Sequence, residues 1–153
     1  TLAELHASGL LRFAQPKRWG GMELDFVALF DVPAELARGC TSTAWNVGNL
    51  AIHHWMLALF DERAQTEAWA ANPDALIASG IAYNQGRARK VEGGYRISAR
   101  KVFTSGAEAG DILMTGAVLD EDGLRITAFA VTHDRSLVEQ LARHLVARID
   151  DSA

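Results

Sequence analysis

Apolar residues recur at three- and four-residue intervals through the first half of the chain, which is the spacing of one helix face. Asp61 stands where a helix N-cap is expected, and Pro16 ends the first apolar segment. Pro33 lies inside the second segment and predicts a kink or a late start there. The pattern predicts four helices, over residues 1–14, 24–38, 40–60 and 62–71.

The second half changes to short apolar runs bounded by turn residues, the pattern of strands. Gly93-Gly94 indicates a hairpin turn, and the acidic stretch 120–123 indicates a second turn. The predicted strand-like runs are 75–82, 86–91, 95–103, 112–119 and 124–131. Apolar residues then return to four-residue spacing and predict a last helix, at Leu137, Leu141, Leu145 and Ile149.

These elements predict an α+β fold with a helical domain over 1–74, a small antiparallel β domain over 75–133 and a helical tail over 134–153. The chain has 153 residues, of which 49% are hydrophobic and 22% charged, as in an ordinary globular protein with a core. The net charge of −4 argues against nucleic acid as the main partner, because binding to phosphates needs a basic surface.

The single cysteine cannot form an internal disulfide, so the cytoplasm is the expected compartment. No apolar run approaches the length of a membrane span, which argues against a membrane partner. The sequence contains no HExxH motif, and one cysteine cannot build a structural zinc site. We therefore expect no metal.

The helix predicted over 40–60 carries an unusual polar and aromatic stripe. Trp45, Asn49 and His53 are four residues apart, and Gly48 beside them would let a flat group approach the backbone. His53 taken alone favours a hydrogen-bonded structural histidine, whereas the stripe favours a wall of a binding pocket. A catalytic histidine is the alternative, because imidazole titrates near neutral pH.

Two turns join an expected strand to a small, hydroxyl-bearing, glycine-ended sequence: Ser79-Gly80 and Thr104-Ser105-Gly106. Such turns present backbone N–H groups and short hydroxyl donors to whatever lies against the sheet. Ordinary loop corners are the alternative, since serine and glycine are common in turns. Neither turn is a GxSxG nucleophile elbow, and the glycines match neither a P-loop nor a GxGxxG fingerprint.

The order and spacing of several motifs resemble the acyl-CoA dehydrogenase superfamily, and in particular its flavin-dependent aromatic monooxygenase branch, the oxygenase components of two-component hydroxylases such as 4-hydroxyphenylacetate hydroxylase. Residues 15–21, QPKRWGG, resemble the turn QPxRxGG of that branch, and residues 35–45 resemble its ELARGCxSTAW stretch. Residues 74–80 resemble the entry to its β domain. Residues 93–106, GGYRISARKVFTSG, resemble GGYRVSGRWxFxSG, the flavin-facing strand.

The resemblance implies a partial β domain of the acyl-CoA dehydrogenase fold and a reduced-flavin-dependent monooxygenase. Such an enzyme takes reduced FMN or FAD from a flavin reductase and hydroxylates a small phenolic or other aromatic substrate through a flavin C4a-hydroperoxide. Carried onto matching positions, His53 and Ser105 would be catalytic, with Ser105 hydrogen-bonded at flavin N5. The implied flavin contacts are Trp45, Ser79, Gly80, Thr104, Ser105 and Gly106.

The chain departs from the family at its C-terminal end, where residues 132–153 do not resemble the family's continuation. We therefore expect a fragment that lacks the C-terminal helical bundle, exposes strand edges, forms a homo-oligomer and is inactive alone. Two alternatives stay open. One is an FAD-dependent acyl-CoA dehydrogenase that oxidises a thioester, and the other is a non-catalytic remnant of the fold.

Overall fold

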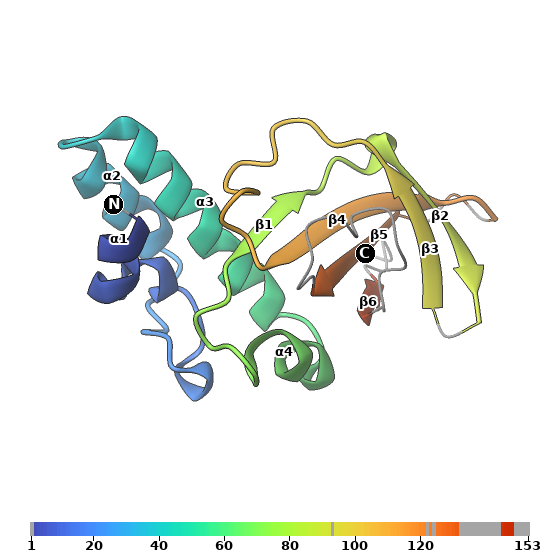
Figure 1. The fold of residues 1–153 in the computed structure, drawn as a ribbon, viewed down its shortest axis with the longest axis horizontal. Coiled ribbons are helices and arrows are strands. Elements are labelled where there is room, and N and C mark those ends of the chain that lie inside the picture. The colour runs from blue at the N-terminus through green and yellow to red at the C-terminus, as the bar shows by residue number, and fades with distance from the viewer. Residues whose placement is uncertain (1, 93, 122, 124, 132–144, 149–153) are drawn as a thin grey trace. The chain divides into compact units, whose positions relative to one another are not determined.

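The protein is described by a computed structural model over residues 2–92, 94–121, 123, 125–131 and 145–148. The chain divides into two compact units, Thr1–Ile77 and Ala78–Ala153 (Figure 1). The first unit is helical, and the second is built on a sheet. An α+β fold is therefore confirmed.

The four predicted helices are present in the first unit: α1 Leu2–Ser8, α2 Ala28–Ala37, α3 Thr41–Ala58 and α4 Glu62–Trp69. α1 is shorter than expected because Gly9 takes a left-handed φ of 75°, which ends the helix. Short 3-10 turns follow it, η1 Leu10–Arg12 and η2 Lys17–Trp19. α4 begins as predicted, because the Asp61 carboxylate accepts a hydrogen bond from the Arg63 backbone N–H at 2.8 Å.

Pro33 lies inside α2, which runs from Ala28 through this proline to Ala37, so the late start predicted at Pro33 is wrong. The helix begins at Ala28, where the Asp25 carboxylate accepts hydrogen bonds from the backbone N–H groups of Val27 and Ala28. The ring of Pro33 then packs on α3, since a Cβ added at Gly48 would lie 2.9 Å from Pro33 Cγ. The space that Gly48 opens beside the backbone is thus filled by Pro33.

The QPKRWGG segment forms a structural lock of the first unit, that is, a turn held by buried hydrogen bonds and close packing. The Gln15 side chain is fully buried, and its Nε2 donates a hydrogen bond to the Pro73 carbonyl at 2.9 Å. Arg12 donates to Gln15 Oε1 at 2.9 Å and pairs with Asp74. Gly21 has no room for a Cβ, which would overlap the Gln15 backbone carbonyl. The segment therefore ties the start of the chain to the end of the helical unit.

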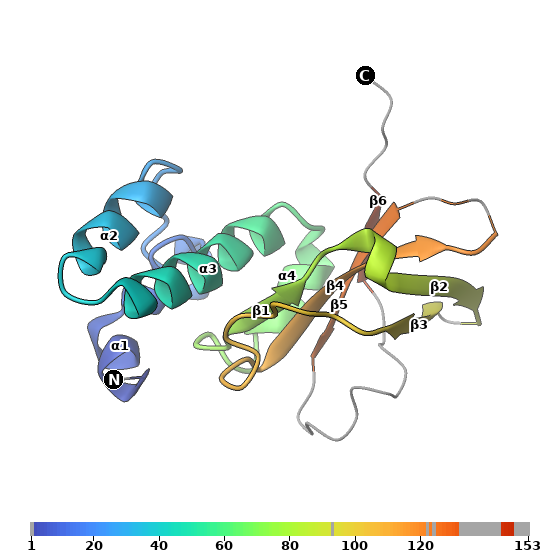
Figure 2. The ribbon, with the colours of Figure 1, turned by 90° about the horizontal axis from the view of Figure 1, so that it is seen from above.

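The second unit contains a six-stranded sheet. Its strands are β1 Ile77–Gly80, β2 Gly86–Val91, β3 Gly94–Ala99, β4 Ile112–Leu119, β5 Arg125–Val131 and β6 Leu145–Arg148. The order is β3-β2-β4-β5-β6, and β1 also pairs with β4. The predicted hairpin is confirmed, because β2 and β3 pair antiparallel with Val91 opposite Gly94 (Figure 2).

The sheet is mixed, which corrects the prediction of an antiparallel one. β2 and β4 are parallel, with Arg87 opposite Val118. The reason lies in residues 100–111, which form no strand and are long enough to carry the chain from β3 across to the far edge of β2. Consecutive strands in sequence are therefore not always neighbours in this sheet.

The prediction of a C-terminal helix is wrong for residues 145–148, which the structure describes. Leu145–Arg148 forms β6, which pairs antiparallel with β5, as in Phe129 opposite Leu145. The edge of β5 offers unpaired backbone groups, and pairing with them outweighs a helical leucine spacing in a four-residue segment. Residues 132–144 and 149–153, where the rest of that helix was predicted, lie outside the described residues.

Within the described part of the chain, none of the helices combines the length and apolar character needed to cross a bilayer.

Candidate functional site

The polar and aromatic residues of α3 begin exposed at Trp45 and end buried in the first unit at His53. Residues four apart advance by about 40° around a helix, so Trp45 and His53 differ by about 80°. Trp45 is accordingly 66% exposed, whereas His53 is 3% exposed. The three residues of the stripe do not form one uniform face.

His53 is held in place by a backbone hydrogen bond. Its Nδ1 lies 3.0 Å from the carbonyl oxygen of Ile77, so Nδ1 carries the proton and donates. Burial lowers the pKa of His53, with the hydrogen bond to Ile77 acting in the opposite direction. The imidazole is therefore neutral at neutral pH, with its lone pair on Nε2. This geometry matches the structural histidine expected from the bare residue, and the catalytic role of His53 stays a prediction.

His54 is the more unusual of the two histidines. Its ring is fully buried and stacks on Trp69, with centroids 5.7 Å apart and planes 9° from parallel. Neither ring nitrogen of His54, nor Nε1 of Trp69, has a hydrogen-bond partner among the described residues. Burial lowers the pKa of His54 to about 3, and the charges of His53 and Arg12 add smaller effects. His54 is thus a neutral packing group.

In the second unit, the two glycine-ended turns predicted as flavin contacts lie against each other. Ser79 and Gly80 end β1 and are buried. A Cβ added at Gly80 would lie 3.2 Å from Thr104 Oγ1 and 2.7 Å from both Cβ and Cγ of Lys101. Gly80 therefore allows the segment after β3 to pack on the end of β1.

The turn at 104–106 is half-buried, unlike the strand corner it packs on. Backbone N–H groups of the following residues close it, from Ala107 to the Thr104 carbonyl at 3.2 Å and from Ala109 to the Gly106 carbonyl at 3.0 Å. Gly106 has a left-handed φ of 79°. The hydroxyls of Thr104 and Ser105 thus stand on a compact turn at the surface of the sheet.

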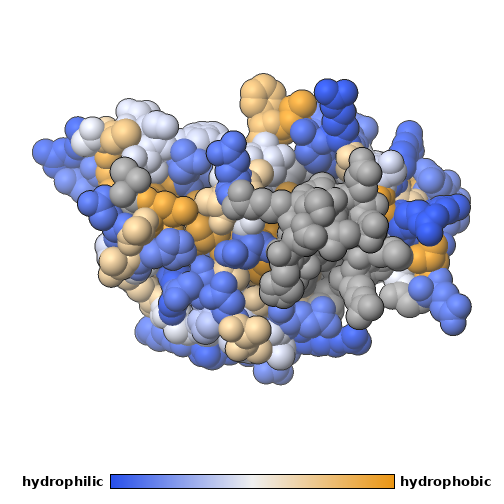
Figure 3. Space-filling view, viewed as in Figure 1, coloured by the Kyte–Doolittle hydropathy of each residue, from blue (hydrophilic) through white to orange (hydrophobic). Residues whose placement is uncertain are grey.

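Phe103, just before this turn, has a conformation that is rare for a residue with a side chain. Its φ is 58° and its side chain is 96% exposed. Val102 beside it is 55% exposed, and Figure 3 shows apolar side chains projecting from the surface over this loop. An exposed aromatic held in a left-handed conformation is a feature that commonly accompanies functional loops.

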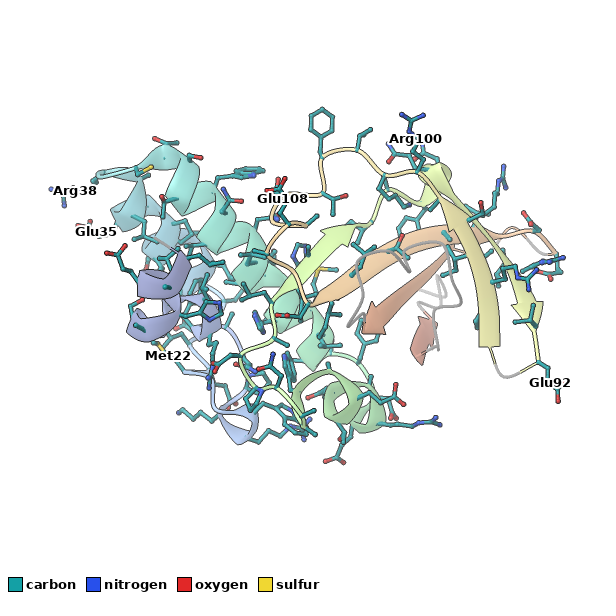
Figure 4. The ribbon with its side chains drawn as sticks, in the orientation of Figure 1. Met22, Glu35, Arg38, Glu92, Arg100 and Glu108 are labelled. Carbon is teal, nitrogen blue, oxygen red and sulfur yellow. The ribbon has the colours of Figure 1, made fainter. Side chains whose placement is uncertain are left out.

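A shallow groove of about 370 Å³ lies beside β2 and β3, away from these turns. It is lined by Asn84, Gln85, Gly86, Arg87, Ser98, Ala99 and Arg100. Figure 4 shows Arg100 at one end of β3, with Glu92 near the hairpin turn at the other. None of the predicted flavin contacts lines this groove, and the described residues contain no cluster of potential metal ligands.

The predicted site residues therefore fall into two groups. Gly80 and Thr104 are brought together in the second unit, with Ser79, Ser105 and Gly106 adjoining them in sequence. Trp45 and His53 belong to the first unit.

Sequence reasoning missed Lys101, whose stem packs on Gly80. A signal was present in the sequence, because Lys101 stands where the motif GGYRVSGRWxFxSG has tryptophan. A polar side chain at a position of the motif that is otherwise aromatic indicates a different local arrangement.

Comparison with known proteins finds one matching family model and several similar flavin-dependent monooxygenases. Residues 1–72 match the family "Acyl-CoA dehydrogenase, N-terminal domain". The oxygenase component of an FADH(2)-dependent resorcinol hydroxylase from Rhizobium sp. (strain MTP-10005) is 36% identical over 118 residues, covering 77% of this chain and 29% of the relative. The p-hydroxyphenylacetate 3-hydroxylase oxygenase component of Acinetobacter baumannii is 34% identical over 124 residues, covering 80% and 29%.

Among solved structures, the HsaA monooxygenase from M. tuberculosis superposes with a TM-score of 0.78 at 31% identity, covering 84% of this chain and 36% of that one. The chain thus spans about three tenths of the length of the curated relatives it matches.

Proposed function

We propose that this chain supplies part of a site for reduced flavin and a phenolic substrate. It is a relative of the oxygenase components of flavin-dependent aromatic monooxygenases, and its residues 1–72 carry an acyl-CoA dehydrogenase N-terminal domain. The observation that carries the proposal is the meeting of Gly80 with Thr104. It places the hydroxyl of Thr104 beside the end of β1.

The donor set of these turns fits a flavin. The edge of an isoalloxazine ring presents nitrogen and carbonyl acceptors, which small hydroxyls and backbone N–H groups can satisfy without crowding the ring. Thr104 and Ser105 are half-buried, so they can reach a ligand while staying anchored. When bound, reduced flavin would activate O₂ and supply the oxygen atom that enters the aromatic ring. FMN and FAD share the isoalloxazine ring, so either could accept hydrogen bonds from these donors.

In this proposal the Ser105 hydroxyl makes the hydrogen bond on the N5 side of the flavin ring, accepting from the N5–H of the reduced form. Trp45 and His53 belong to the first unit, and the resemblance supports their proposed roles toward flavin and substrate. Trp45 offers an exposed indole, whose face can stack on a flat ring. The Nδ1 of His53 donates to the Ile77 carbonyl, which fixes the orientation of its ring.

Flavin binding is the first test. FMN and FAD, reduced under anaerobic conditions, are titrated into the parent chain and into the Ser105→Ala and Trp45→Ala variants, with Ser98→Ala as control. Ser98 is exposed on β3, opposite Arg87, and is not among the predicted flavin contacts. Loss of one hydrogen bond predicts about a tenfold weaker Kd for Ser105→Ala. Equal Kd values for all four proteins would refute the assigned contacts.

The reaction is the second test. Admitting O₂ with a panel of phenols and a flavin reductase should yield hydroxylated products. Two other readings predict different outcomes. Binding of oxidised FAD that bleaches on addition of an acyl thioester indicates an acyl-CoA dehydrogenase. Absence of flavin binding indicates a non-catalytic interaction protein.

We propose a flavin reductase and a second copy of this chain as partners. Several large apolar side chains of the first unit are exposed, including Phe30 at 65%, Trp45 at 66% and Leu59 at 68%. α2 contains no buried residue at all, and Figure 3 shows apolar surface over the helical unit. Exposed apolar surface of this kind favours self-association. A monodisperse monomer in light scattering at micromolar concentration would contradict it.

A further inference from the structure

Lys101 connects three parts of the second unit that are distant in sequence. It follows β3, and its Nζ donates hydrogen bonds to the carbonyl oxygen of Ala82 at 2.6 Å and to that of Gly116 at 2.5 Å. Ala82 follows β1, and Gly116 lies in the middle of β4. One ammonium group therefore joins the loop after β3 to two other segments of the sheet unit.

Glycines clear the path that the lysine side chain follows. A Cβ at Gly80 would lie 2.7 Å from the Lys101 Cβ and Cγ, and a Cβ at Gly86 would lie 3.2 Å from Nζ. Gly116 is equally crowded, since its Cβ would lie 2.5 Å from the Ile81 carbonyl oxygen. Gly80 of β1 and Gly86 of β2 thus leave space for the stem and the ammonium group, and Gly116 of β4 leaves space for the backbone at Ile81.

The chain beyond Lys101 is one that needs an anchor. Phe103 has a φ of 58° with its side chain almost fully exposed, so its own side chain does little to hold it in that conformation. One residue later, Thr104 Oγ1 returns to within 3.2 Å of the Cβ position of Gly80. A rarely adopted backbone conformation persists when the surrounding structure fixes it, and Lys101 is the fixed point on the N-terminal side.

Lys101 is half-buried, and this partial burial lowers the pKa of its ammonium group. The carbonyl oxygens of Ala82 and Gly116 replace part of the hydration of that group. A donor with two fixed acceptors favours a single geometry, whereas an apolar side chain of similar length would leave both carbonyls without this donor.

We propose that Lys101 is a positioning residue that clamps the loop 101–106 onto the sheet, so that Thr104 and Ser105 hold the orientation in which they meet reduced flavin. The inference rests on the proposed function for its consequence, but the clamp itself can be tested without flavin. The family motif has tryptophan at this position, so a lysine clamp is a feature of this chain.

The parent protein allows a direct test, because Lys17, Lys90 and Lys101 are its only lysines. Limited acetylation with an N-hydroxysuccinimide ester is followed at each lysine by mass spectrometry. Lys90 is exposed on β2 and serves as the internal reference. We expect Lys101 to react at least about tenfold more slowly than Lys90, because the two carbonyl contacts hold its Nζ against the sheet and block approach of the ester. This shielding opposes the faster acylation that the lowered pKa of Lys101 would give by itself. Equal rates would overturn the clamp.

Substitutions test what the clamp does. Lys101→Met keeps the length of the stem and removes the donors, Lys101→Arg keeps a charged donor, and Lys90→Met is the matched control. Amide hydrogen exchange over residues 102–107 should accelerate at least about tenfold in Lys101→Met, recover in part in Lys101→Arg, and stay at the parent rate in Lys90→Met. The Kd for reduced FMN should follow the same order, with about a tenfold loss in Lys101→Met.

The two measurements separate the clamp from the proposed function. Faster exchange with an unchanged Kd would show that the loop is clamped for another purpose and would overturn the positioning role. If the parent binds no flavin, the proposed function fails while the exchange result still decides the clamp. If Lys101→Met does not fold, the acetylation ratio in the parent and the Lys101→Arg variant test the clamp instead. Amide exchange over 102–107 in Lys101→Arg that is more than about tenfold faster than in the parent would count against the clamp.

Discussion

Two glycine-ended turns of this chain look alike in sequence and are used differently. The first, QPKRWGG at 15–21, is closed around a buried glutamine whose side chain donates to the Pro73 carbonyl. The second, KVFTSG at 101–106, stands half-exposed, with Phe103 extended from the surface and two hydroxyl side chains on the following turn. Both segments carry part of the resemblance to the flavin-dependent monooxygenases.

Burial and hydrogen bonding separate the residues that hold the fold from those that can contact a ligand, although both belong to motifs of the same family. A side chain that is buried and hydrogen-bonded within its own unit, as Gln15 is, has no capacity left for a ligand. A turn with short donors at the surface and strained backbone beside it has that capacity, and such turns are where ligand contacts occur. Breaking the first turn should therefore damage folding, and breaking the second should damage binding.

The largest effect is expected at Gly21. A methyl group there would overlap the Gln15 backbone carbonyl, so Gly21→Ala should lower the free energy of unfolding by about 3 kcal/mol or more. Gly39→Ala is the control, because the nearest atom to its Cβ position is 3.7 Å away. All four tryptophans, Trp19, Trp45, Trp55 and Trp69, lie in the helical unit, so their fluorescence during urea unfolding reports on it. A Gly21→Ala variant as stable as Gly39→Ala would contradict the structural lock.

The next largest effect concerns the buried histidine of the helical unit. The folded pKa of His54 is about 3, below its ordinary 6.5, so the unfolded chain binds the proton first as pH falls. Stability is therefore complete above pH 6.5 and is lost below it, by about 2–3 kcal/mol at pH 4.5 from this group. His54→Phe should flatten this dependence, and His6→Gln, at an exposed position of α1, should not. Parallel pH profiles for parent and His54→Phe would contradict the assignment.

The smallest effect on stability is expected in the second turn. Phe103→Gly relieves the left-handed φ and gives up an exposed side chain, so we expect a change of less than about 1 kcal/mol in unfolding free energy. Native-state hydrogen exchange of the β4 amides measures it, since the sheet unit has no tryptophan. A loss as large as that in Gly21→Ala would mean that this turn is scaffold too.

Much of the fold could be predicted from the sequence, because it depends on local patterns. The four-residue apolar spacing located α3, and Gly93-Gly94 located the hairpin of β2 and β3. Pairings between distant segments could not be predicted in this way. The parallel contact of β2 with β4 depends on where residues 100–111 carry the chain, and β6 forms because a partner edge is available.

The candidate site likewise contains features that depend on local patterns and features that depend on contacts between distant segments. Ser79, Gly80 and Thr104 were recognisable as turn residues, and the structure brings Gly80 and Thr104 together. The hydrogen bonds of Lys101 were not predictable, because both of its acceptors are backbone carbonyls, which every residue has. The burial of His54 and its stacking on Trp69 also depend on tertiary packing.

The most direct test of the account compares both turns in one experiment. Amide hydrogen exchange is measured in the parent chain under anaerobic conditions, with and without saturating reduced FMN. We predict slower exchange at 79–81 and 102–107 on flavin binding, with no change at 15–21. Protection confined to 15–21, or no protection at 102–107 in protein that binds the flavin, would contradict it.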